Sequence, residues 1–421
     1  MKNKIIAIIC LVATLLSMTT LGACSAAAAE TWINYELSEE PDYSFAVIGD
    51  IQTLAWFDQR ERTTYTKTLF DWILDNADDR KIEYVFGLGD TIETLSSWGE
   101  EGYNTSVTNP GEWALTSKEI KRLDGVIPYL ITRGNHDDEA GYHKYICTDA
   151  YKAQMDGFCY DADKIALRGN SMSNSYKTIE VNSQKYLMMS LDFDVNDETI
   201  AWANRVISEY SDHRVIVATH AYNSSSGGFL KGDVGQPGLD DETDGDEHHD
   251  WFYFDGERLW SEIFSQHENM FMVLNGHVSV TDPVIQTRMG KNKNYVFEVL
   301  VDPQAYDERA HEAGEGAGAF VMLINFSRSH NKLEFEYIST TRDMHFKASN
   351  QLTKKVPGTS LLILKTTAAA TTAESTSNDT VTEAPTSDDK GCGSALLSTV
   401  SITAMIGTAL ATFAFRKKEN D

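Results

Sequence analysis

The sequence predicts an α/β fold in which buried strands alternate with helices over one large folded region. The chain has 421 residues, and 42% of them are hydrophobic, which is enough to bury a sizeable core. Short apolar runs repeatedly end in a polar residue, as buried strands do at their carboxyl ends. These runs are YSFAVIGD ending at Asp50, IEYVFGLGD at Asp90, IPYLITRGNHD at Asp137, RVIVATH at His220 and MFMVLNGH at His277.

The first element, residues 1–29, is predicted to be a secretory signal peptide. Lys2 and Lys4 precede an apolar run from residue 5 to residue 16, and small residues follow as far as Ala29. The stretch ending at Cys24 also resembles a lipoprotein processing site. Cleavage of the signal peptide without attachment of a lipid is favoured, because the carboxyl-terminal part of the chain already predicts a membrane anchor.

Helical and hairpin patterns connect the apolar runs. Apolar residues recur every three to four positions from Tyr65 to Asn76 and from Ile200 to Tyr210, which predicts two helices. Asn196 or Asp197 is placed to cap the second helix. Alternating patterns predict three hairpins, over residues 175–193, 283–301 and 319–338.

The carboxyl-terminal part of the sequence predicts a tether and a membrane anchor. Residues 366–390 are rich in Thr and Ser and lack aromatic residues, so they are expected to form a disordered tether. Residues 395–415 carry no charge and are followed by Arg416, Lys417 and Lys418, as expected of a transmembrane helix with a cytoplasmic basic flank. The folded region is therefore expected outside the cell membrane, with its catalytic domain extracellular.

The net charge of −27 argues against a nucleic-acid-binding surface, because such surfaces are basic. The most acidic stretch, residues 240–250, is interpreted as a solvated loop, with calcium binding as the alternative. Cys147 and Cys159 are the cysteines of the folded region, and the sequence leaves open whether they pair.

Polar strand ends are expected to meet in one site. In α/β sheets the carboxyl ends of the strands line the ligand crevice. The residues gathered there would be two carboxylates, an amide and three imidazoles: Asp50, Asp90, Asn135, His136, His220 and His277. Oxygen and nitrogen ligands in this mixture suit Mn, Fe or Zn.

The order of these motifs resembles the calcineurin-like metallophosphoesterases over residues 42–350. The matching blocks are Gly49-Asp50-x-Gln52, Gly89-Asp90-x-x-Glu93, Gly134-Asn135-His136-Asp137, Thr219-His220 and Gly276-His277. The resemblance implies a two-layer β-sandwich flanked by α-helices. It also implies that Asp90 bridges two metal ions and that Asn135, His220 and His277 complete the second metal site.

The same resemblance implies hydrolysis of a small-molecule phosphate ester by metal-activated water. His136 would bind the phosphate and protonate the leaving oxygen, and Asp137 is a candidate for orienting it. Arg133 could add positive charge to the phosphate pocket, although an arginine at the surface is the favoured interpretation. Aromatic residues such as Trp113 are interpreted first as core residues and second as a stacking surface for the substrate.

The sequence departs from the family's usual pattern at the first metal. Where the family has two histidines, this chain has Gln52 and Ser279. A site built from Asp50, Gln52 and Asp90 favours Mg, Mn or Ca. Ser279 is expected to act outside the ligand shell, beside a ligand or a bound water. A bacterial surface-associated subgroup of the family is similar in these positions and in VLVDPQAYD, residues 299–307.

Two functions are consistent with the sequence. The first is an extracellular, membrane-anchored, metal-dependent phosphoesterase that acts on a phosphomonoester or phosphodiester and uses one or two divalent metal ions. The alternative is a catalytically weak or inactive surface protein that binds a ligand or a host partner. The presence of His136 favours the enzyme, because a pure binding protein needs no acid for a leaving group.

Overall fold

The computed structural model describes residues 31–93, 109–159, 172–193, 195–233 and 253–356. The predicted signal peptide, tether, transmembrane helix and acidic loop at residues 240–250 lie outside these ranges. Among the described residues, every helix is too short or too polar to cross a membrane.

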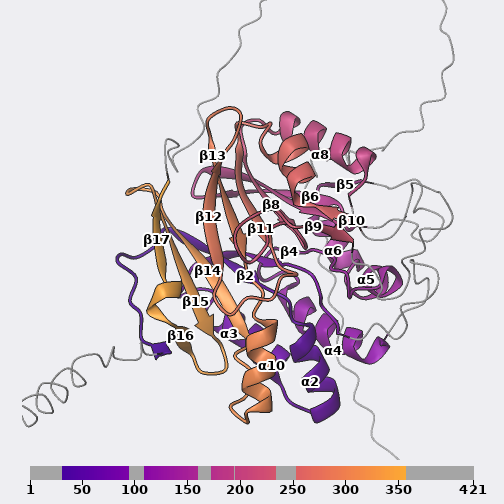
Figure 1. Cartoon of the computed structure of the whole chain (residues 1–421), viewed down its shortest axis with the longest axis vertical. Coiled ribbons are helices and arrows are strands. Elements are labelled where there is room, and N and C mark those ends of the chain that lie inside the picture. Colours follow the sequence, from indigo (N-terminus) through magenta and orange to yellow (C-terminus); the bar gives the residue numbers. More distant parts are fainter. Residues whose placement is uncertain (1–30, 94–108, 160–171, 194, 234–252, 357–421) are drawn as a thin grey trace, which may run out of the picture.

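Two mixed sheets form the framework (Figure 1). Sheet A has the order β1-β16-β15-β14-β2-β3-β4, with β17 paired to β15. Its strands are β1 (Trp32–Ile33), β2 (Tyr43–Ile48), β3 (Ile82–Gly87), β4 (Tyr129–Ile131), β14 (Phe320–Ser327), β15 (Lys332–Ser339), β16 (Met344–Phe346) and β17 (Leu352–Lys355).

Sheet B has the order β12-β13-β11-β8-β7-β6-β5, and β9 pairs separately with β10. The strands of sheet B are β5 (Gly157–Phe158), β6 (Ser175–Val181), β7 (Gln184–Leu191), β8 (Arg214–Thr219), β11 (Met270–Asn275), β12 (Val284–Met289) and β13 (Tyr295–Leu300). The separate pair consists of β9 (Lys231–Asp233) and β10 (Tyr253–Asp255).

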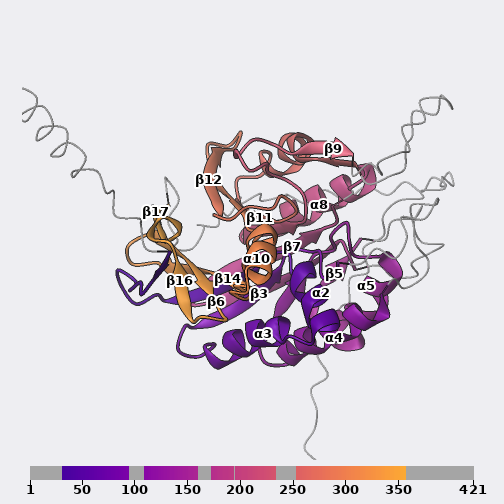
Figure 2. The ribbon, with the colours of Figure 1, turned by 60° about the horizontal axis from the view of Figure 1, so that its bottom comes forward.

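Helices cover the outer faces of both sheets. The α-helices are α2 (Gln52–Glu61), α3 (Tyr65–Asp75), α4 (Pro110–Ile120), α5 (Glu139–Tyr145), α6 (Asp149–Gln154), α8 (Asp197–Glu209), α9 (Gly256–Leu259) and α10 (Gln304–Glu312). Shorter turns are the 3-10 helices η1 (Lys121–Leu123) and η3 (Ala348–Asn350) and the π-helix η2 (Trp260–Phe264). Figure 2 shows α3 and α4 on one side of the molecule and α8 on the other.

Three apolar cores hold these layers together. The central core joins the facing sides of the two sheets, for example Phe45 of β2 and Ile216 of β8. A second core packs sheet A against α3 and α4, and a third packs sheet B against α8. Each fully buried large side chain contributes about 1.5–3 kcal/mol. The expected two-layer β-sandwich flanked by helices is therefore present.

The predicted helices and hairpins are confirmed. The pattern from Tyr65 gives α3, and the pattern from Ile200 gives α8, whose amino end is capped by Asn196 through a hydrogen bond from the Thr199 N–H. The three hairpins are β6–β7, β12–β13 and β14–β15. Strands β2, β3 and β4 run parallel, as do β7, β8, β11 and β13.

The buried carboxyl of Asp307 on α10 is expected to make the stability of the fold depend on pH. Asp307 is 1% exposed, and its Oδ1 accepts hydrogen bonds from the backbone of Gly318 and Ala319, whereas its Oδ2 has no partner. Burial raises the pKa of Asp307 to about 7. Because the unfolded carboxyl titrates near pH 4, the free energy of unfolding falls as the pH rises from about 4 to about 7, by at most about 4 kcal/mol.

Asp307→Asn is therefore expected to leave the Tm of metal-free protein nearly unchanged at about pH 4 and to raise it by several degrees at about pH 8. The amide keeps an oxygen for Gly318 and Ala319 and removes the buried charge. Thermal unfolding at the two pH values checks this expectation. An equal change in Tm at both values would show that burial does not shift the pKa of Asp307 in the folded protein.

Candidate metal centre

The predicted site residues converge at the carboxyl ends of parallel strands from both sheets. Asp50, Asp90 and Asn135 follow β2, β3 and β4 of sheet A, and His220 and His277 follow β8 and β11 of sheet B. Sheet packing brings the two sets together, because the Asn135 side chain contacts both histidines. One site thus draws its side chains from both layers of the sandwich.

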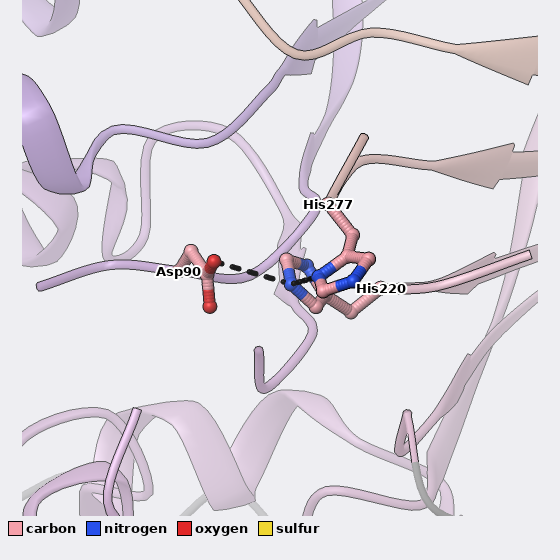
Figure 3. Close-up of side chains that lie close together, drawn as sticks. All are labelled: Asp90, His220 and His277. Carbon is pink, nitrogen blue, oxygen red and sulfur yellow. Dashed lines mark hydrogen bonds and ion pairs between the residues drawn. The ribbon is translucent and has the colours of Figure 1, made fainter. Parts of the chain in front are cut away.

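Four donor groups face one another at the centre of this site. The Asn135 Oδ1 atom lies 2.9 Å from His220 Nε2 and 2.8 Å from His277 Nδ1. The same His220 nitrogen lies 3.2 Å from Asp90 Oδ2 and 3.2 Å from His277 Nδ1. Figure 3 shows the Asp90 carboxylate and the two imidazoles directed toward one another. Ligand atoms of these three residues all lie within 4.8 Å of one another, as the ligands of a metal ion do.

The hydrogen bonds of His220 fix which nitrogen faces the centre. Its Nδ1 lies 2.8 Å from the carbonyl oxygen of Leu88, which can only accept, so Nδ1 carries a proton. In neutral His220 the lone pair of Nε2 therefore faces the oxygens of Asp90 and Asn135. Acceptors at such distances repel one another unless a cation lies between them. The residues consequently fit a divalent metal ion.

The shifts in pKa agree with this arrangement. Burial lowers the pKa of His220, but the negative charge of Asp90 and the hydrogen bonds to Asp90 and Leu88 outweigh burial and raise it overall. Burial and the neighbouring charge of His220 lower the pKa of His277 to about 4. These opposite shifts favour a proton on His220 over one on His277 in metal-free protein.

Glycines precede the ligands because the site has no room for a Cβ there. A Cβ on Gly134 would lie 2.2 Å from both the backbone nitrogen and Oδ1 of Asp90. A Cβ on Gly276 would lie 2.1 Å from Asp50 Oδ1. The predicted ligands Asp90 and His277 have positive φ angles of 48° and 67°, a strained conformation that is common at functional sites.

Gly134→Ala is expected to displace Asp90, to destabilise the protein by about 1–3 kcal/mol and to remove metal. The backbone nitrogen of Asp90 cannot move away as a flexible side chain can. Elemental analysis and thermal unfolding check both effects. Gly228→Ala is the control, because its nearest neighbour, Ser224 Oγ, would be 3.4 Å away. Normal metal content in the Gly134 variant would contradict this account.

His136 lies at the edge of the donor cluster and is half-buried. Its backbone N–H donates to Asp90 Oδ1 at 2.8 Å, and its ring Nδ1 lies 2.9 Å from the carbonyl oxygen of Glu93. Burial lowers the pKa of His136, whereas Asp90 and the Glu93 carbonyl raise it, and the net pKa lies above the ordinary value.

Asp137 accepts hydrogen bonds from the backbone of two loops. Its Oδ1 accepts hydrogen bonds from the backbone of Thr91 and Ile92, and its Oδ2 accepts one from Gly134. The carboxylate therefore joins the loop after β3 to the loop after β4. The Glu93 carbonyl oxygen contacts the His136 ring at Nδ1, 2.9 Å away, and so helps to orient it.

The two residues that replace the family's histidines behave differently. Gln52 is 2% exposed, stands at the first position of α2 and has an amide Oε1 without a hydrogen-bond partner. Ser279 is exposed, and its Oγ accepts a hydrogen bond from the backbone of Ala305 at 2.8 Å. Ser279 thus holds the amino end of α10.

Three other residues are buried in structural roles. Arg133 is 2% exposed and pairs with Asp192 at 2.9 Å and with Glu139 at 3.0 Å, so the expected surface position is wrong and its charge is already engaged. Trp113 is fully buried and donates to Asp138, which confirms it as a core residue. Cys147 is a free, buried thiol, so it forms no disulfide with Cys159.

One buried carboxyl at the site is absent from the sequence-based set. Asp302 follows β13, is 0% exposed and lies within hydrogen-bonding reach of the Asp50 carboxyl. The signal was available, because the run YVFEVLVD ends in a polar residue like the other buried strands. Asp302 was not included because the same run was interpreted as the second strand of a hairpin, which it also forms with β12.

Two packed sheets flanked by helices, with oxygen and nitrogen donors gathered at their carboxyl-end edge, define an α/β sandwich protein with a candidate metal site. The sequence profile of the calcineurin-like phosphoesterases matches residues 43–260, which is about half of the chain. The chain belongs to the calcineurin-like phosphoesterase family. Membership of this family supports a metal-dependent hydrolase in general.

Individual relatives are distant. The uncharacterized protein YvnB of Bacillus subtilis strain 168 is 25% identical over 301 residues, which cover 67% of this chain and 19% of YvnB. The chain thus spans about a fifth of the length of that relative.

Two solved structures are similar at 10% sequence identity. GAP50, described as the anchor in the inner membrane complex of Plasmodium, has a TM-score of 0.37 and covers 75% of this chain and 88% of its own. TT1561 of Thermus thermophilus has a TM-score of 0.34 and covers 75% of this chain and 99% of its own. At these scores neither structure contributes to the assignment of function.

Proposed function

We propose that this chain is a metal-dependent phosphoesterase that hydrolyses a small phosphomonoester or phosphodiester. The observation that supports the proposal is the convergence of Asp90, Asn135, His220 and His277, whose donor atoms face one another at 2.8–3.2 Å. The imidazoles suit Mn, Fe or Zn at this position. These four residues would hold a divalent ion, which would supply positive charge for the phosphoryl oxygens and lower the pKa of water at neutral pH.

Residues of the chain would supply the charge, the orientation of the ligands and the proton for the leaving group. Asp90 supplies negative charge at the centre, and its Oδ1 is held by the His136 N–H. Leu88 keeps the His220 Nε2 atom directed inward through its carbonyl. Because the Glu93 carbonyl engages Nδ1 of His136, we assign the proton for the leaving oxygen to Nε2 of that ring.

The proposal includes a location. The basic start, the apolar run to residue 16 and the apolar run at residues 395–415 support an enzyme that is secreted and anchored, with its catalytic domain outside the cell. Cell fractionation together with protease treatment of intact cells tests it. If protease digests the domain only after the cells are lysed, the proposed location outside the cell is wrong.

Metal stripping and reloading test the reaction. The full chain is treated with EDTA, dialysed and reloaded separately with Mn, Zn, Mg or Ca. Hydrolysis of p-nitrophenyl phosphate and bis-p-nitrophenyl phosphate is then measured. Asp90→Asn, purified in the same way, controls for contaminating phosphatases. We expect activity to disappear with EDTA and to return with Mn or Zn. Tight metal binding without turnover of either ester would instead support the surface-binding alternative.

A further inference from the structure

Asp302 occupies the edge of sheet B next to the candidate metal centre. Strand β13 runs parallel to β11, with Leu300 opposite Asn275, so its carboxyl end reaches the same edge as His277. The carbonyl oxygen of Asp302 accepts a hydrogen bond from the Val280 N–H at 2.8 Å. This bond joins the loop after β13 to the loop that carries His277.

Three buried oxygens in this region lack hydrogen-bond partners. They are Asp50 Oδ1, Gln52 Oε1 and Asp302 Oδ2, on residues that are 2%, 2% and 0% exposed. Leaving even one buried polar group unsatisfied costs about 1–3 kcal/mol, and more when it is charged. Three unpartnered acceptors on residues that are linked through Gln304 and the Asp50–Asp302 pair therefore favour a positive group between them.

The other polar atoms of these side chains are already engaged. Asp50 Oδ2 accepts from the His277 N–H at 3.0 Å, and Asp302 Oδ1 accepts from the Gln304 N–H at 3.0 Å. The Gln52 Nε2 atom donates to Gln304 Oε1 at 3.4 Å. Each residue is thus held by one end and keeps a single oxygen available.

The carboxyls of Asp50 and Asp302 lie within hydrogen-bonding reach of each other. Two ionised carboxylates so close together repel each other, and a cation between them would offset that repulsion.

We propose that Asp302 is a ligand of the first metal site and that it forms, with Asp50, Asp90 and Gln52, an all-oxygen centre for a hard cation such as Mn, Mg or Ca. This inference rests on the proposed function, because it completes the same centre. Asp302 compensates for the two missing histidines from a strand that the family motif does not include. Ser279, engaged with Ala305, contributes no ligand.

A proton shared between Asp50 and Asp302 is the competing explanation. In that case Asp302→Asn would satisfy Asp50 with an amide N–H and would leave metal binding unchanged. As a metal ligand, Asp302 would instead be needed for one of two ions. Counting bound ions therefore separates the two explanations without reference to turnover.

The experiment titrates the full chain, stripped with EDTA, with Mn or Zn by calorimetry and confirms the bound ions by elemental analysis. We expect the wild-type protein to bind two equivalents of Mn and Asp302→Asn to bind one. Ser279→Ala is the matched control and is expected to bind two. Zinc reports on the His220 and His277 site, so one tight equivalent of Zn in every variant shows that the site is still folded.

Each outcome decides the question. Two equivalents of Mn in Asp302→Asn, or one in the wild-type protein, would overturn the inference. These outcomes would not decide the proposed function, which the ester hydrolysis assay tests separately. Two ions in the wild-type protein without hydrolysis would contradict the proposed function but not the ligand. If Asp302→Asn also loses Zn, Asp302→Ser replaces it under the same criterion, because its hydroxyl keeps an acceptor for Gln304.

Discussion

Asp90→Asn is expected to abolish turnover and to remove most of the bound metal. The carboxylate stands between the two predicted metal sites, with Oδ2 3.2 Å from His220 Nε2 and its charge close to Asp50. An amide has the same shape but carries no charge, and its N–H₂ group can donate to His220 in the place of the cation. We expect the metal affinity to fall by more than the roughly 10–100-fold that loss of an outer-shell partner costs.

Elemental analysis and ester hydrolysis on the same preparation measure both effects. The fold should persist, because the amide oxygen still accepts from the His136 N–H. Asp282→Asn is a suitable control, since Asp282 is a carboxylate outside the site that pairs with Lys347 at 2.7 Å. Two retained ions in the Asp90 variant would show that Asp90 is not a ligand.

His136→Ala is expected to lower turnover by about 10²–10⁴-fold and to leave the metal content unchanged. The separation follows from the contacts of this residue. Its backbone N–H, which survives the substitution, holds Asp90, whereas its ring contacts the carbonyl of Glu93. The ring therefore acts on the substrate in our proposal and does not support the metal.

The leaving group provides a sharper test of the His136 prediction. Nitrophenolate leaves readily without a proton, whereas an alkoxide needs one. Loss of the acid should therefore reduce hydrolysis of an alkyl phosphate much more than hydrolysis of p-nitrophenyl phosphate. An equal reduction for both esters, or loss of metal from the variant, would assign His136 a different role.

Much of the fold could be predicted because local patterns determine it. The repeat of Tyr65, Leu69 and Trp72 gives α3, and the alternation within residues 175–193 and 319–338 gives hairpins. Helix α2 was not predicted, although it begins at Gln52 directly after Asp50. Its hydrophobic periodicity is weak, and its burial depends on packing against α3, α4 and α10, which the local sequence does not reveal.

The predicted ligands could likewise be recognised in the sequence, because each follows a buried strand. Glycines also stand where the backbone lies close to a predicted ligand. Positions 134 and 276 have no room for a Cβ, so the sequence has glycine there, directly before Asn135 and His277. The role of Asp137 was not visible, because its partners Thr91 and Ile92 belong to a different loop. A contact between loops is decided by how strands lie side by side.

The sequence by itself determined the apolar strands, the order of the polar strand ends and the loss of two histidines at Gln52 and Ser279. Only the tertiary structure decided what replaces them. Strand β13 pairs with β12 as a hairpin and also lies parallel to β11, and this second pairing brings Asp302 beside Asp50. The alternating pattern of a strand specifies which face is buried, but it does not specify which neighbour lies on each edge. For that reason the sequence marks Asp302 as a polar residue at the end of a strand, but only the folded protein shows that it lies beside Asp50.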